Sequence, residues 1–142
     1  MKIKLKIFMT NWVNLVGIFL AAYLFTIITE IVKLFPNKLT SDEILNSLFV
    51  GFLGGLFGIL GYGLIFWLGF LLAIFLLDMI LMSPKRENLR IKLLFEWIAI
   101  SIPFVYWGIQ YTEWIWFILV LCFLLTQLLR EKKIQATLSP MS

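Results

Sequence analysis

Four long apolar tracts, separated by short polar segments, constrain what this chain can fold into more than any other feature. They cover residues 12–35, 48–82, 91–108 and 114–129. A helix needs about 20 predominantly apolar residues to cross the hydrocarbon core of a bilayer. Only 14% of the 142 residues are charged, compared with about 25% in a soluble domain. Such a chain cannot cover itself with a polar surface, so we expect a single transmembrane domain, residues 1–142.

The second tract is too long for one simple crossing. As a straight helix, its 35 residues would extend about 52 Å at the helical rise of 1.5 Å per residue. The hydrocarbon core is only about 30 Å thick. The tract therefore crosses either once, with a surplus of length, or twice, with a turn near Gly61 and Gly63.

The distribution of basic residues favours a single crossing, because cytoplasmic loops of membrane proteins are enriched in Lys and Arg. With one crossing, the side that holds both termini carries ten such residues: Lys2, Lys4, Lys6, Lys85, Arg86, Arg90, Lys92, Arg130, Lys132 and Lys133. The opposite side carries only Lys33 and Lys38. With two crossings, three Lys and Arg residues would lie on the cytoplasmic side and nine on the opposite side.

We therefore predict an all-α, polytopic bundle of four transmembrane helices in a cell membrane, such as the bacterial inner membrane. The helices are expected at about 12–35, 44–82, 91–108 and 114–130. The second helix is over-long and glycine-rich, and Ser41, Asp42 and Glu43 before it are typical of a helix start. Both termini are expected in the cytoplasm, with residues 131–142 as a cytoplasmic tail.

The segment "GFLGGLFGILGYG" places six glycines within residues 51–63. At 100° per residue, one helix face collects the following five glycines: Gly51, Gly54, Gly55, Gly58 and Gly69. Two G-x-x-x-G pairs share this face, and in lipid such pairs allow helix backbones to approach closely. Three interpretations stay open: a groove for another helix of the same chain, a seam between copies, or a broken half-helix hinged at Gly61 and Gly63.

Asp78 and Glu96 are the most informative polar residues inside the apolar tracts. They lie near the inner ends of the second and third helices, which are antiparallel neighbours, so we expect both carboxylates at a similar depth. Arg86, Arg90 and Lys92 are close enough in sequence to neutralise them. The pair is either a structural anchor or a proton- or cation-binding site, because ionisable residues in a membrane often mark function.

Two further features complete the sequence-based picture. Pro103 lies in the middle of the third helix and predicts a kink, because proline removes a backbone donor. The chain contains no histidine and one cysteine, which excludes histidine-ligated metal sites and Ser-His-Asp catalysis. We therefore expect no catalytic residues, no metal and no cofactor, and we find no signature of nucleic-acid binding.

The leading functional hypothesis is a small non-enzymatic integral membrane protein. It would act through helix packing with itself or with partner membrane proteins, as an accessory, assembly or immunity-type subunit in the lipid bilayer. The alternative is a small oligomeric channel or a proton- or cation-coupled transporter. In that case the glycine-rich helix and the Asp78–Glu96 pair would face the conduction path.

Overall fold

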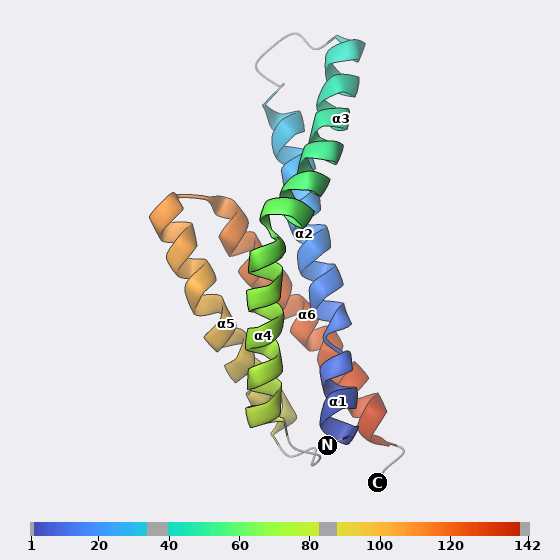
Figure 1. Ribbon diagram of the computed structural model, residues 1–142, viewed down its shortest axis with the longest axis vertical. Coiled ribbons are helices and arrows are strands. Elements are labelled where there is room, and N and C mark those ends of the chain that lie inside the picture. Colours follow the sequence, from blue (N-terminus) through green and yellow to red (C-terminus); the bar gives the residue numbers. More distant parts are fainter. Residues whose placement is uncertain (1, 34–39, 83–87, 140–142) are drawn as a thin grey trace.

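The computed structural model describes residues 2–33, 40–82 and 88–139, and this part of the chain contains helices and no strands (Figure 1). In chain order the elements are α1 (Lys2–Met9), α2 (Trp12–Val32), α3 (Ser41–Phe57), the π-helical turn η1 (Gly58–Tyr62), α4 (Leu64–Leu81), α5 (Leu89–Tyr111) and α6 (Trp114–Leu138). The predicted all-helical fold is confirmed.

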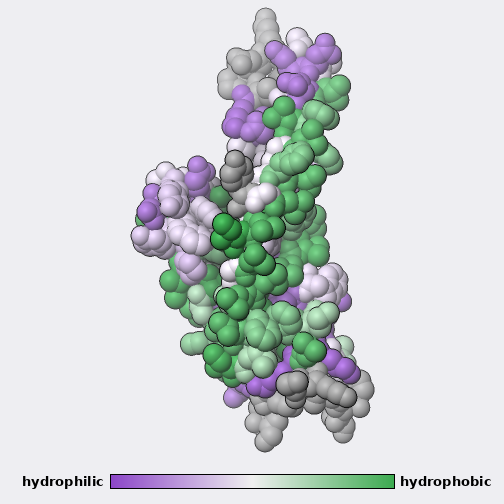
Figure 2. Space-filling view, in the orientation of Figure 1, coloured by the Kyte–Doolittle hydropathy of each residue, from purple (hydrophilic) through white to green (hydrophobic). Residues whose placement is uncertain are grey.

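Four helical segments of the described chain are long and apolar enough to cross a membrane. They are Lys4–Val32, Ser41–Gly61, Leu64–Leu81 and Trp114–Leu138. The space-filling view shows apolar residues along most of the column, with hydrophilic residues at its two ends and at the turn between α5 and α6 (Figure 2). These features are compatible with a multi-pass membrane protein.

The expected continuous helix 44–82 consists of three segments, α3, η1 and α4. The segments follow one another without reversing direction (Figure 1), so this stretch is not an antiparallel pair with a turn near Gly61. Within η1 the Gly63 amide donates to the Gly58 carbonyl at 3.0 Å, the i→i+5 pattern of a π-helix. A π-bulge is a recognised cause of a helix bend.

The last helix extends well past its expected end at residue 130. It continues to Leu138, so most of the expected tail, residues 131–142, is helical, and the last three of those residues lie outside the described chain. The extension follows from packing, because Ile134 and Leu138 are buried in a small cluster with Ile7 of α1. The amino-terminal helix α1 contacts both α4 and α6.

The interior has two apolar clusters at different heights along the bundle. The larger contains Ile18, Ala22, Phe70, Ile74, Ile100, Phe104, Leu119, Val120 and Phe123. The smaller contains Ile7, Met82, Leu89, Leu93, Ile134 and Leu138. Between the two clusters, the buried residues other than Val13 are polar: Thr10, Asn11, Asn14, Asp78, Glu96, Thr126, Gln127 and Arg130. This polar layer is the candidate functional site.

Candidate functional site

Arg130 of α6 is the centre of the polar layer and is completely buried. Its Nη2 donates to both carboxylate oxygens of Asp78, at 2.7 and 2.6 Å. Its Nη1 donates to both oxygens of Glu96, at 3.0 and 2.9 Å. The guanidinium therefore bridges α4 and α5 through two charge-assisted contacts, which are among the stronger hydrogen bonds in proteins.

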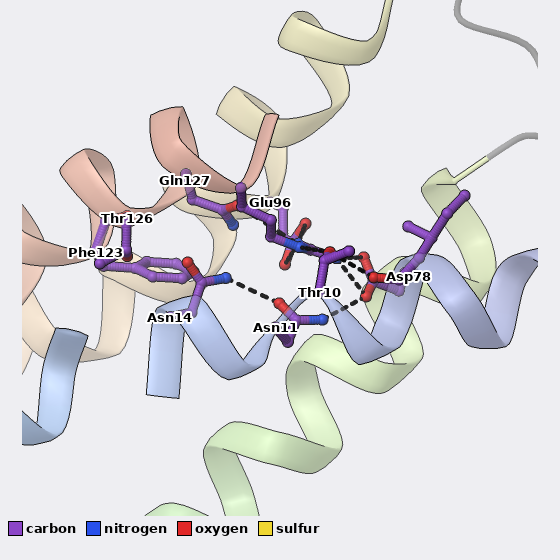
Figure 3. A network of polar contacts seen from close by, with 10 residues as sticks. Thr10, Asn11, Asn14, Asp78, Glu96, Phe123, Thr126 and Gln127 are labelled. Carbon is purple, nitrogen blue, oxygen red and sulfur yellow. Dashed lines mark hydrogen bonds and ion pairs between the residues drawn. The ribbon is translucent and has the colours of Figure 1, made fainter. Parts of the chain in front are cut away.

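The amino-terminal helices complete the layer. Arg130 Nε donates to the hydroxyl of Thr10 at 3.0 Å, and that hydroxyl donates to the Ile7 carbonyl at 2.6 Å. The amide of Asn11 donates to Asp78 at 2.6 Å, and the amide of Asn14 donates to Asn11 at 2.8 Å. We call Thr10, Asn11, Asn14, Asp78, Glu96, Gln127 and Arg130 the Arg130 cluster (Figure 3).

The spacing of residues along each helix explains why these side chains meet. Side chains four residues apart lie on the same face of a helix. In α4, Phe70 and Ile74 precede Asp78, and Met82 follows it, all at intervals of four and all buried. In the same way, Ile134 and Leu138 follow Arg130 on α6. Each polar residue thus occupies a core position, with an apolar layer on either side.

The structure brings Asp78 and Glu96 together, as expected, but the cation between them is not one of those expected. Arg90 is exposed and Lys92 only half-buried, while Arg86 lies outside the described residues. The sequence pattern places Arg130 with the basic residues on the cytoplasmic side, because it begins the run "REKK". Its spacing of four from Ile134 and of seven from Phe123 is the signal that places it on the buried face of α6.

Three buried polar atoms of the described chain have no hydrogen-bond partner: Asn14 Oδ1, Gln127 Nε2 and Ser101 Oγ. Two of them belong to the Arg130 cluster, where Gln127 accepts only a long bond of 3.4 Å from Arg130 Nη1. Figure 3 shows Asn14 and Gln127 at the end of the network away from Asp78. Such atoms are costly when buried unless a further polar group reaches them.

The glycines of the predicted stripe have different surroundings. A Cβ at Gly51 would lie 3.4 Å from Ile27 and Glu30 of α2, and a Cβ at Gly55 would lie 3.2 Å from the ring of Tyr23. At Gly54, Gly58 and Gly69 a Cβ would meet no atom within 4 Å.

The tightest helix contacts made through glycine involve two residues outside the stripe. A Cβ at Gly17 would collide with Thr126 of α6, and a Cβ at Gly108 would come within 2.8 Å of the Phe117 ring. Both glycines therefore allow close packing against α6. Their isolation in sequence gave no signal of this role.

The predicted hinge residues lie at the irregular segment η1, whereas the predicted kink residue Pro103 lies inside a continuous helix. Gly61 is inside η1 and Gly63 follows it directly. Pro103 lies inside α5, which continues through it as one helix. Ser101, two residues earlier, has a buried hydroxyl without a hydrogen-bond partner.

A lateral groove separates α4 from the half of α5 that leads to the α5–α6 turn. It encloses about 830 Å³ and is lined by apolar and aromatic side chains. Gly69 and Ala73 of α4 and Ala99 of α5 are the small residues of its lining, and Phe66 and Trp107 are among the large ones. Contacts between α4 and α5 are sparse compared with those between α5 and α6.

The chemistry available to the described residues is therefore ion pairing in a buried layer and apolar contact in a groove. No group of three or more His, Cys, Asp or Glu side chains among them is arranged to hold a metal ion. Comparison of the chain with protein-family models, with curated proteins and with solved structures finds no match.

Proposed function

We propose that this chain is a small non-enzymatic membrane subunit that binds one apolar transmembrane helix of a partner membrane protein in the groove between α4 and α5. The observation that supports this most is the groove itself, which the chain leaves unfilled over about 830 Å³. It would act as an accessory, assembly or immunity-type subunit, with both termini in the cytoplasm.

Small residues in the groove favour a helix over lipid chains. Gly69 and Ala73 are spaced four apart on α4, and Ala99 lines the groove from α5. A Cβ at Gly69 would meet no atom within 4 Å, so another backbone has room to approach. Close backbone approach at small residues is what drives helix association in membranes, where the hydrophobic effect contributes little.

The aromatic residues of the groove hold one another in place. The rings of Trp107 and Trp116 lie 5.1 Å apart, and those of Phe66 and Phe104 lie 5.4 Å apart. These are favourable distances for aromatic pairs. A lining that is already packed loses little conformational entropy when a helix binds.

The concave shape of the groove favours a helix of a different protein, and not a second copy of this chain, as its occupant. A two-fold dimer places the same surface of both copies in contact. Two grooves facing each other would leave both unfilled, so a convex helix from another chain is the better occupant.

Site-specific photocrosslinking in native membranes tests the proposal. A photoreactive residue at Leu76, which lines the groove, should give a product that maps to a transmembrane segment of another protein. Gly69→Leu should abolish this product by filling the groove. Gly54→Leu is the matched control, because Gly54 is also open but lies on α3, away from the groove.

Other products would contradict the proposal. A product that contains only two copies of this chain would identify a homo-oligomer seam. A product with lipid alone would identify a lipid-binding groove. A partner product that survives Gly69→Leu would place the partner elsewhere.

The second candidate function is a proton- or cation-coupled transporter, which the burial of Asp78 and Glu96 favours. Both carboxylates are bound to Arg130, and apolar clusters lie on both sides of them, so we rank it second. Proteoliposomes of the purified chain would have to show a selective flux that Asp78→Asn and Glu96→Gln both abolish.

A further inference from the structure

The charges in the Arg130 cluster do not balance. Asp78, Glu96 and Arg130 are each at least 97% buried, so two carboxylates share one guanidinium. The other residues that face them from α1, α2 and α6 are Thr10, Asn11, Asn14 and Gln127, which do not titrate.

Two described lysines of the terminal helices, Lys4 and Lys133, have other partners. The Lys4 ammonium donates to the Met79 carbonyl at an exposed site, and the Lys133 ammonium lies over the exposed Trp12 ring. With both carboxylates ionised, the cluster would carry one uncompensated negative charge between two apolar layers. Such a charge is strongly unfavourable in a protein interior.

We propose that the Arg130 cluster binds one exchangeable proton, which is carried by Glu96. Asp78 accepts short bonds, of 2.6–2.7 Å, from two donor groups, Arg130 Nη2 and the Asn11 amide, whereas the bonds from Arg130 Nη1 to Glu96 are longer, at 2.9–3.0 Å. A carboxylate with more donors is better stabilised in its ionised form. Asp78 therefore keeps the charge that pairs with Arg130, and Glu96 takes the proton.

A small cavity, lined by four leucines and by Arg90, Gln127 and Glu131, lies beside the cluster. It encloses about 10 Å³ between α5 and α6. This is about the space that one water molecule requires. A water molecule there would accept a hydrogen bond from Gln127 Nε2, which has no other partner. A hydronium ion arriving by this route transfers its proton to a Glu96 oxygen and remains as water.

Infrared spectroscopy of the full chain in lipid nanodiscs tests this inference at neutral pH. The wild-type protein should show the carbonyl stretch of one protonated carboxylic acid, and ¹³C-labelled glutamate should shift that band. Glu96→Gln should lose the band. Asp78→Asn should lose it too, because Glu96 and Arg130 then form a neutral pair. Glu113→Gln, at an exposed position away from the cluster, is the control and should keep it.

Several results would overturn the inference. They are a wild-type protein without the band, a band that labelled glutamate does not shift, and a band that survives in Asp78→Asn. A wild-type protein that lacks the band but is stabilised by sodium chloride over choline chloride would show that a metal cation balances the charge. If either variant fails to fold, the wild-type protein with ¹³C-labelled glutamate still decides whether a glutamate carries the proton. Crosslinking in the α4–α5 groove is independent of all these outcomes.

Discussion

At the scale of single residues, Arg130 connects more of the molecule than any other described side chain. It contacts Thr10 beside α1, Asp78 on α4 and Glu96 on α5, and it belongs to α6. Its partners Asp78 and Glu96 are 52 and 34 residues away in sequence. A buried network of this kind is sensitive to the loss of one member, because the remaining charges stay buried without compensation.

We expect Arg130→Gln to lower the free energy of unfolding by about 3–5 kcal/mol, because buried Asp78 loses its counter-charge and Glu96 loses its hydrogen-bond donor. Lys132→Gln removes the same charge from an exposed position on the same helix and should change stability by less than about 1 kcal/mol. Denaturant titration in detergent micelles compares the two. Equal effects would mean that the Arg130 contacts do not stabilise the bundle.

Two members of this cluster, Asp78 and Glu96, were predicted from the sequence, and the other five were not. The similar depth of Asp78 and Glu96 followed from their positions near one short loop. The choice of Arg130 required knowledge that α6 continues as a helix beyond residue 130 and turns that side chain inward. A run of basic residues at the end of an apolar tract reads as a solvated tail, and only the burial of Ile134 and Leu138 contradicts this reading.

At the scale of elements, η1 is the irregular segment that joins α3 to α4. Its π-helical pattern leaves the Ile59 carbonyl to accept a bond from Trp67 Nε1 at 3.2 Å. A Cβ at Gly63 would collide with the same carbonyl oxygen. Gly63 and Trp67 therefore both stabilise the interruption, one by lacking a side chain and the other by donating a hydrogen bond.

We expect Gly63→Ala to destabilise the protein by about 1–3 kcal/mol, because the backbone at Ile59 must move to accept the methyl group. Gly61→Ala is the matched control, since a Cβ there would meet no atom within 4 Å. Thermal unfolding in detergent, followed by circular dichroism, measures both variants. If Gly61→Ala is the more destabilising change, the steric account of η1 is wrong.

At the scale of the whole molecule, the chain forms two helical hairpins, α2 with α3 and α5 with α6, which extend to different heights along the bundle. α2 and α3 rise beyond the turn that joins α5 and α6 (Figure 1). The start of α1 and the end of α6 lie at the same end of the bundle, where α1 contacts α6. The polar layer is close to that end, so the two hairpins are joined by charge there and diverge at the other end.

We expect reporters fused at Met1 and at Ser142 to be on the same, cytoplasmic side of the membrane, because that side would carry ten of the twelve Lys and Arg residues. A reporter inserted between Lys33 and Thr40 should be on the opposite side. Alkaline phosphatase and green fluorescent protein fusions measure this directly. Phosphatase activity at Ser142 would contradict the arrangement.

The sequence by itself determined that the chain is helical and apolar over membrane-spanning lengths. In a bilayer each backbone polar group must be satisfied within its own helix or within a closed barrel, so composition and tract length predict the element type. It also placed two carboxylates at one level of the bundle. Only the tertiary structure decided that Arg130 neutralises them, that Gly17 and Gly108 are contact glycines, and that α4 and α5 leave a groove. The reason is that a helix that is apolar on all sides does not reveal which face turns inward; packing against the other helices selects that face.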